Sequence, residues 1–200
     1  MRRRSARTAI LIVFLLLVAL ADAAVQRSRA DGDRLQKKID DIAANGAAAR
    51  TKPKTTPVSE SELNSYLAFN LRNDVPRGLA EPEIVMSGDG SLAGRVLVDI
   101  DEFNRSRGPQ SVLDPLSYLS GQVPVTARGV LRTHEGRGRF YLSSAELQGV
   151  PLPRSVVQEL VRYFSRTADN PRGIDMDEPF DLPAKIRRIE VGRGEAVVAQ

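Results

Sequence analysis

The 200-residue sequence contains no cysteine, no tryptophan and a single histidine, His134. The absence of cysteine excludes disulfide bonds, thiolate catalysis and zinc sites built on thiolates. One histidine is too few for the common histidine metal sites, and a catalytic triad could use only His134. The nucleophile elbow, the P-loop, the zinc-protease motif and the dinucleotide-binding glycine motif are all missing. We therefore expect a protein that is not an enzyme and that uses no cofactor or metal.

The positive charge of the chain is concentrated near its N-terminus. The net charge is +4 overall, with +3 in residues 1–23, +4 in residues 24–57 and −3 in residues 58–200. Because the larger part of the chain is acidic, the basic total gives little support for binding to nucleic acid. Targeting and a solvated basic tether explain it better, with weak attraction of that tether to anionic lipid headgroups as the alternative.

Residues 1–23 show the three parts of a secretory signal peptide. An arginine cluster precedes an apolar run over residues 9–21, and Ala21-Asp22-Ala23 fits a cleavage site before Ala24. The alternative is an uncleaved inner-membrane anchor over residues 9–25, although the run is shorter than the ~20 residues that usually span a bilayer. In both cases we expect the rest of the chain outside the cytoplasm, in the periplasm or cell envelope.

Residues 24–57 have the composition of a basic tether that keeps the following domain close to the membrane. Leu35, Ile39 and Ile42 share one helical face, which predicts a short helix ending at Asn45-Gly46. The small, basic and proline-containing stretch that follows predicts a semi-extended linker.

A single α+β domain is predicted over residues 58–200. Ser59 and Glu62 fit a capping box at the start of a helix over residues 60–71, and a second amphipathic helix is expected over residues 153–165. A short helix over residues 111–119 is predicted more weakly because it contains a proline. Three glycine-tipped hairpins are expected, over residues 83–86 with 92–101, 123–133 with 139–147, and 186–191 with 195–199. The expected order is α-ββ-α-ββ-α-ββ, with an antiparallel sheet of about six strands packed on two or three helices.

Polar residues that could carry chemistry are few and scattered. His134 falls at a predicted hairpin tip, where an exposed role is expected. Two acidic groups could bind Ca²⁺ or act as acid and base, but neither has the spacing of a calcium loop, so solvated strand ends and turns are expected. Their members are Asp99, Asp101 and Glu102, and Asp175, Asp177, Glu178 and Asp181.

Apolar surface is the remaining feature of the domain that could bind a ligand. The two strongest predicted helices carry wide apolar stripes, which either form an ordinary closed core or leave an elongated groove against the sheet. The side chains expected to line such a groove are Leu63, Tyr66, Leu67, Val156, Leu160 and Phe164.

Three segments resemble parts of small exported bacterial proteins with the tubular lipid-binding (TULIP-like) fold. The first is the helix start over residues 58–67, which reads V-S-E-S-E-L-N-S-Y-L. The second is the stretch before a predicted helix, Gln148-Gly149-Val150-Pro151-Leu152-Pro153, and the third is the terminal hairpin over residues 189–198. The resemblance implies a curved antiparallel sheet that shelters lipid, and it implies no catalytic residues. The helix over residues 153–165 is short for that fold, which favours a shallow groove over a tunnel.

These observations predict an exported, non-catalytic protein that binds a lipid or another apolar small molecule in a groove between sheet and helix. The alternative is a structural or assembly module that docks another envelope protein through a sheet edge or an apolar patch.

Overall fold

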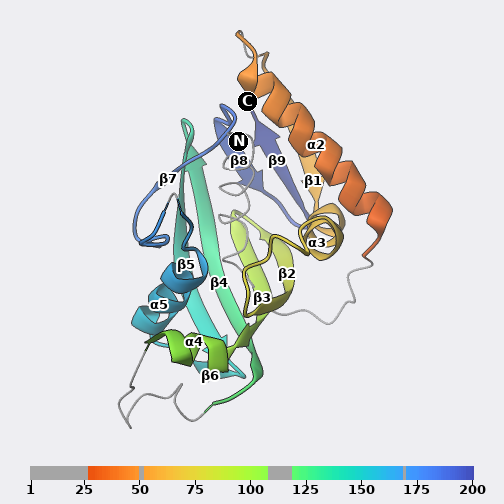
Figure 1. Cartoon of the computed structure of the whole chain (residues 1–200). Helices are drawn as coiled ribbons and strands as arrows, with labels where there is room; N and C mark the ends of the chain where they lie inside the picture. The colour runs from red at the N-terminus through yellow and green to blue at the C-terminus, as the bar shows by residue number, and fades with distance from the viewer. Residues whose placement is uncertain (1–26, 50–51, 108–118, 169) are drawn as a thin grey trace.

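A computed structural model describes residues 27–49, 52–107, 119–168 and 170–200. The expected signal peptide and nearly all of the helix expected over residues 111–119 lie outside the described residues. The described part is an α+β fold with a six-stranded and a three-stranded sheet (Figure 1). Within the described ranges, no helix combines the length and the apolar character needed to cross a membrane.

The larger sheet is antiparallel and is built around the first two predicted hairpins. Its strands follow the order β2 (Leu79–Gly88), β3 (Ser91–Asp99), β4 (Gln122–His134), β5 (Arg137–Leu147) and β6 (Val150–Pro151), and β7 (Phe180–Asp181) also pairs with β5. The pairs Met86–Leu92 and Thr133–Gly138 confirm the two hairpins. The exact element order differs from the predicted one, because the structure adds short strands that were not predicted. In this sheet they are β6 and β7.

Tight turns connect three pairs of neighbouring strands in the larger sheet, β2 with β3, β4 with β5 and β5 with β6. Asp89-Gly90, Glu135-Gly136 and Gln148-Gly149 each have positive φ at both residues, as in two-residue type I′ turns. The tips of the first two predicted hairpins are therefore glycine-dependent, as expected, whereas the turn at Gln148-Gly149 was not predicted. The turn at Gln148-Gly149 also folds β6 back onto β5.

The third predicted hairpin belongs to a separate three-stranded sheet. β8 (Arg188–Val191) and β9 (Glu195–Ala199) pair as expected, but the other neighbour of β9 is β1 (Thr55–Ser59). Residues 55–57 were expected in a linker. Thr56 and Val58 are buried while their neighbours are more exposed, so this segment has the alternation of a half-buried strand.

The helix α2 (Arg29–Ala47) corrects the expectation of a tether over residues 24–57. It has 19 residues, and the Ser28 side chain caps its N-terminus by accepting a hydrogen bond from the Asp31 N–H at 3.1 Å. Leu35 and Ile42 are buried in the same apolar cluster as residues of the predicted domain. Residues 29–47 therefore form part of the folded unit, because their apolar stripe is buried against it.

Three further helices are described. α3 (Glu60–Phe69) and α5 (Arg154–Phe164) match predicted helices. α4 (Ile100–Arg107) was not predicted, and its first two residues were expected at the end of a strand. The strand ends at Asp99 because its carboxylate accepts a hydrogen bond from the Glu102 N–H at 3.0 Å, which starts a helix.

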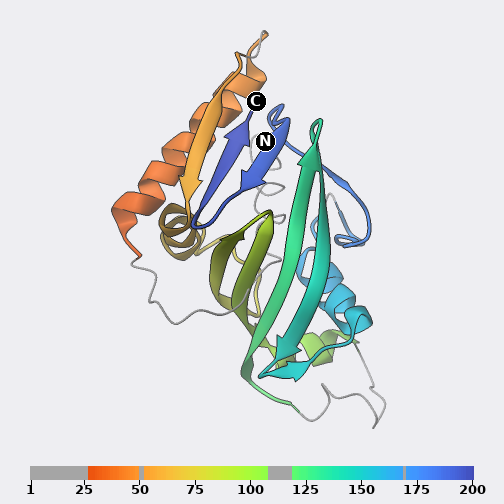
Figure 2. The same ribbon diagram turned by 180° about the vertical axis from the view of Figure 1, so that it is seen from behind.

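All helices except α3, which lies at the junction of the sheets, lie on one side of the sheets. α4 and α5 lie in front of the larger sheet in Figure 1, and α2 runs along the smaller one. In Figure 2 the view from behind shows strands β2 to β5 with no described helix in front of them. We call this uncovered side of the two sheets the open face.

Candidate functional site

Three of the predicted groove residues, Leu63, Tyr66 and Leu67, lie on α3 in a closed core. Their exposed fractions are 5%, 7% and 2%. They share one buried apolar cluster with Leu35 of α2 and with residues from both sheets. This part of the predicted site is filled by the protein's own side chains.

The other three, Val156, Leu160 and Phe164, lie on α5 in a second cluster. Leu160 is buried, whereas Val156 and Phe164 are only partly buried against the cluster. Phe103 of α4 packs with its ring centroid 6.1 Å from that of Phe164 and in a stacked orientation. The six predicted residues are therefore divided between two apolar clusters and do not line a common groove. Their role as ligand contacts stays a prediction.

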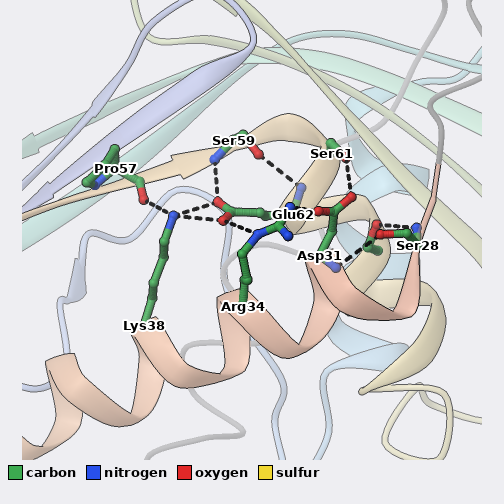
Figure 3. Close-up of polar contacts among 9 residues, drawn as sticks. Ser28, Asp31, Arg34, Lys38, Pro57, Ser59, Ser61 and Glu62 are labelled. Carbon is green, nitrogen blue, oxygen red and sulfur yellow. Dashed lines mark hydrogen bonds and ion pairs between the residues drawn. The ribbon is translucent and has the colours of Figure 1, made fainter.

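The start of α3 is a dense polar network that joins α3 to α2 (Figure 3). Ser59 and Glu62 form the predicted capping box, with N–H to oxygen distances of 3.1 and 3.0 Å. Lys38 of α2 donates to both carboxylate oxygens of Glu62 at 2.8 Å and to the carbonyl of Pro57 at 2.8 Å. Arg34 lies 3.6 Å from the same carboxylate. The carboxylate of Glu62 thus caps the N-terminus of α3 and also binds the neighbouring helix α2.

Electrostatics at Glu62 follow from this geometry. Burial raises the pKa of its carboxyl group, but the hydrogen bonds from Lys38 and Ser59 outweigh that effect, so the pKa of Glu62 lies below its ordinary value. The carboxylate is ionised and fully engaged at neutral pH. It is therefore suited to holding structure and poorly suited to acid–base chemistry.

Two other polar residues of α3 cover the edge of the larger sheet. The fully buried side chain of Asn64 accepts from the N–H of Ile84 and donates to its carbonyl, both at 2.7 Å. Glu60 accepts a hydrogen bond from the N–H of Met86 at 2.6 Å. The E-x-E-x-N spacing of the helix start thus has a structural explanation. The side chains of residues 60 and 64 satisfy backbone groups of strand β2 that would otherwise lie at an open edge.

The remaining candidates from the sequence have structural partners or lie in solvent. Asp99 caps α4, and Asp101 accepts from the N–H of Gly121 at 2.8 Å. Asp175 forms an ion pair with Arg162, while the side chain of His134 is 85% exposed. In the described ranges no group of three or more possible ligands is placed to hold a metal ion.

Asp175 and Asp177 lie in the loop after α5 and form ion pairs with arginines of that helix. The Asp175 carboxylate accepts a hydrogen bond from the Asp177 N–H and pairs with Arg162, and these contacts lower its pKa from the ordinary value. Asp177 pairs in turn with Arg154. The carboxylates of this loop are therefore engaged by arginines of α5 and are not arranged around a vacant position for a cation.

A cleft that the sequence did not predict lies where the two sheets meet on the open face. Thr133 of β4 joins the sheets because its hydroxyl donates to the carbonyl of Ile189 at 2.7 Å and accepts from its N–H at 2.8 Å. The cleft beside this contact has a volume of about 710 Å³. We call it the seam cleft, and it is lined by Asp89, Gly90, Leu131, Arg132, Thr133, Arg188, Ile189, Glu190, Val191, Gly192, Arg193, Glu195 and Val197.

No family model, curated protein or solved structure matches this chain.

These regions present side chains that could contact a ligand. The seam cleft contains three arginines and three carboxylates, but the hydroxyl of Thr133 is occupied by Ile189. The clusters around α5 contribute apolar and aromatic side chains. The seam cleft could not be found from sequence, because its residues come from three segments far apart in the chain, and their contact depends on how the two sheets meet.

Proposed function

We propose that this chain is an exported, non-catalytic protein of the cell envelope that binds a lipid or another apolar molecule on the helix side of its larger sheet. The site is the α5 half of the predicted set, Val156, Leu160 and Phe164. The α3 half, by contrast, contributes to the closed core.

One observation carries this proposal. The apolar residues around α5 form clusters separate from the core beneath α2 and α3, and Val156 and Phe164 at their margin are only partly buried. Partly buried apolar and aromatic side chains beside a helix are the surface that apolar ligands use. The resemblance of the helix start and the terminal hairpin to exported lipid-binding proteins supports the same class of ligand.

Native mass spectrometry of the full chain purified from cell envelopes tests the proposal. We expect an additional mass that organic solvent extracts, and Val156→Trp should lower its occupancy severalfold by filling the site. Val150→Trp adds the same volume at a residue that is 64% exposed and should retain the ligand. Purification of ligand-free protein from envelopes, with no apolar molecule in the extract, would contradict the proposal.

A second candidate function is an assembly module, and one observation favours it. Among the large hydrophobic side chains of the described residues, Tyr141 and Val150 are 49% and 64% exposed, and both lie in the β5–β6 region. Such residues could dock another envelope protein there. Stoichiometric co-purification of one protein that is lost in Val150→Asp, in the absence of extracted lipid, would favour this function.

A further inference from the structure

We propose that residues 174–177 form a strap that closes an apolar gap between α5 and β5 and opens to admit the ligand. The inference deepens the proposed function and rests on it for the class of ligand, a lipid or another apolar molecule. The strap belongs to the connection between α5 and β7, whose described residues form no helix or strand. Connections longer than about 12 residues without secondary structure are uncommon, and many are lids or binding loops.

The strap runs antiparallel to α5 and is bound by polar side chains at the helix. Ser165, directly after the helix, accepts a hydrogen bond from the N–H of Ile174 at 2.7 Å. Gln158 donates to the carbonyl of Ile174 at 3.0 Å and accepts from the N–H of Met176 at 2.9 Å. Because these contacts are made by side chains, the strap can leave without breaking the backbone hydrogen bonds of the helix or of the sheet.

The outer contacts of the strap are ion pairs in contact with solvent. Asp175 pairs with Arg162 and Asp177 pairs with Arg154, and the two arginine side chains are 48% and 49% exposed. Arg139 of β5 also donates to the carbonyl of Asp177 at 2.6 Å. Exposed ion pairs contribute little to stability in water and are screened by salt. These contacts therefore hold the strap in place but oppose its opening only weakly.

The side chain of Met176 fills the gap beneath the strap. It is 7% exposed and packs with Val157 and Val161 of α5 and with Ala145 of β5. Methionine is unbranched and flexible, so it fills irregular apolar space and adapts to changes around it. An acyl chain is also unbranched and apolar. It has the shape to take the place of Met176 when the strap moves outward.

The gap beneath the strap adjoins the proposed apolar site. Leu152 packs against the cluster that contains Leu160 and also against the cluster that contains Met176. Helix α5 contributes Val156 to the first cluster and Val157 to the second, so the two clusters share the helix as well. The opened strap would therefore provide a route from solvent to the proposed site.

Amide hydrogen exchange of the ligand-free full chain tests whether the strap opens. The N–H groups of Ile174 and Met176 donate to side chains, so we expect them to exchange at least about 100-fold faster than the N–H of Val161 within α5. Local opening exposes little surface, so this exchange should be insensitive to low urea concentrations. Exchange of all three N–H groups at one rate would overturn the proposal, because the strap would then open only when the fold does.

The double variant S165C/I174C tests whether opening admits the ligand. Its two thiols can be bridged, because Oγ of Ser165 lies 2.7 Å from the backbone nitrogen of Ile174 and the chain has no other cysteine. After bound lipid is removed on a hydrophobic resin, the oxidised variant should take up cis-parinaric acid, a fluorescent fatty acid, at least about tenfold more slowly than the same variant after reduction. The wild type, treated with the same oxidant and reductant, should show no difference.

A second double variant tests the ion pairs. R154Q/R162Q loses both pairs and should take up the probe about threefold faster than the wild type, whereas R72Q/R77Q removes the same charge at two exposed residues after α3 and should match the wild type. Equal uptake by oxidised and reduced S165C/I174C would overturn the strap and leave the proposed function standing. Absence of uptake by the wild type would contradict the proposed function itself.

Discussion

At the scale of single residues, the polar side chains at the start of α3 decide how the chain is held together. Glu60, Glu62 and Asn64 each bind a different partner, namely the N–H of Met86, Lys38 of α2, and the backbone of Ile84. Buried polar groups are stabilising only when their hydrogen bonds are complete. Each of these residues is therefore more sensitive to substitution than its polarity suggests.

Asn64→Ala should destabilise the fold by about 2–3 kcal/mol, because it leaves a buried N–H and a buried carbonyl of Ile84 unpaired. Urea unfolding at neutral pH measures this change. Asn73→Ala is a matched control at an exposed residue and should change the free energy of unfolding by less than about 0.5 kcal/mol. Equal stability of the two variants would contradict the assigned role of Asn64.

Glu62→Gln should remove a part of the acid sensitivity of the protein. Because the pKa of Glu62 is lowered in the folded state, its contribution is complete above the ordinary pKa of glutamate, about 4.3, and is lost as the pH falls through the folded value. We expect the variant to be about 1–2 kcal/mol less stable than the wild type at pH 7, with the difference shrinking below about pH 4.

Thermal unfolding between pH 3 and pH 7 measures this dependence. Glu178→Gln, at an exposed residue, provides the control, and its curve should run parallel to that of the wild type. A constant difference between Glu62→Gln and the wild type over the whole pH range would show that ionisation of Glu62 does not stabilise the fold.

At the scale of elements, α2 is fitted closely to the rest of the molecule by glycines on its buried face. A Cβ atom on Gly46 would come within 2.3 Å of the carbonyl oxygen of Ala184, and one on Gly32 within 2.4 Å of Oδ1 of Asn70. Glycine is a poor helix former, so its presence within a helix of 19 residues is explained by close packing.

Gly46→Ala should therefore destabilise the protein, although the same change in an exposed helix would stabilise it by about 1 kcal/mol. The backbone of Ala184 cannot move aside without disturbing the loop before β8. Denaturant unfolding of Gly46→Ala and of Ala44→Gly, a propensity control on the exposed face of α2, separates the two effects. A gain in stability for Gly46→Ala would show that α2 does not pack closely against this loop.

At the scale of the whole molecule, the smaller sheet joins the segment after α2 to the last strand of the chain. β1 pairs with β9, and the side chain of Gln200 donates to the carbonyl of Ile42 in α2 at 2.9 Å and to that of Ala184 at 2.6 Å. The two sheets then meet at Thr133 and Ile189. The core beneath α2 and α3 consequently depends on segments from across the chain.

Removal of α2 should expose this core. A chain that begins at Lys52 would uncover the cluster around Leu63 and Leu67, whereas a chain that begins at Arg27 retains it. We expect the shorter chain to lose cooperative thermal unfolding and to bind a hydrophobic dye, and the longer chain to unfold cooperatively. Two equally stable chains would contradict the placement of α2 within the folded unit.

The amino-acid sequence by itself determined the local structure. The capping box at Ser59 and Glu62, the glycine turns and the apolar stripe of α5 all depend on residues that are close along the chain, and all were predicted. The α+β class followed from the order of these elements. The boundary at residue 58 was not predicted well, because the small residues of α2 resemble a linker until their partners are known.

Only the tertiary structure decided which predicted apolar residues share a cluster. Leu63 and Leu160 have similar patterns in sequence, but α3 packs beneath α2 and α5 packs on the larger sheet, so they lie in different cores. The side of the sheet on which each strand residue lies depends on strand register, and the seam cleft depends on how two separate sheets meet. Both are long-range arrangements, which local sequence patterns do not encode.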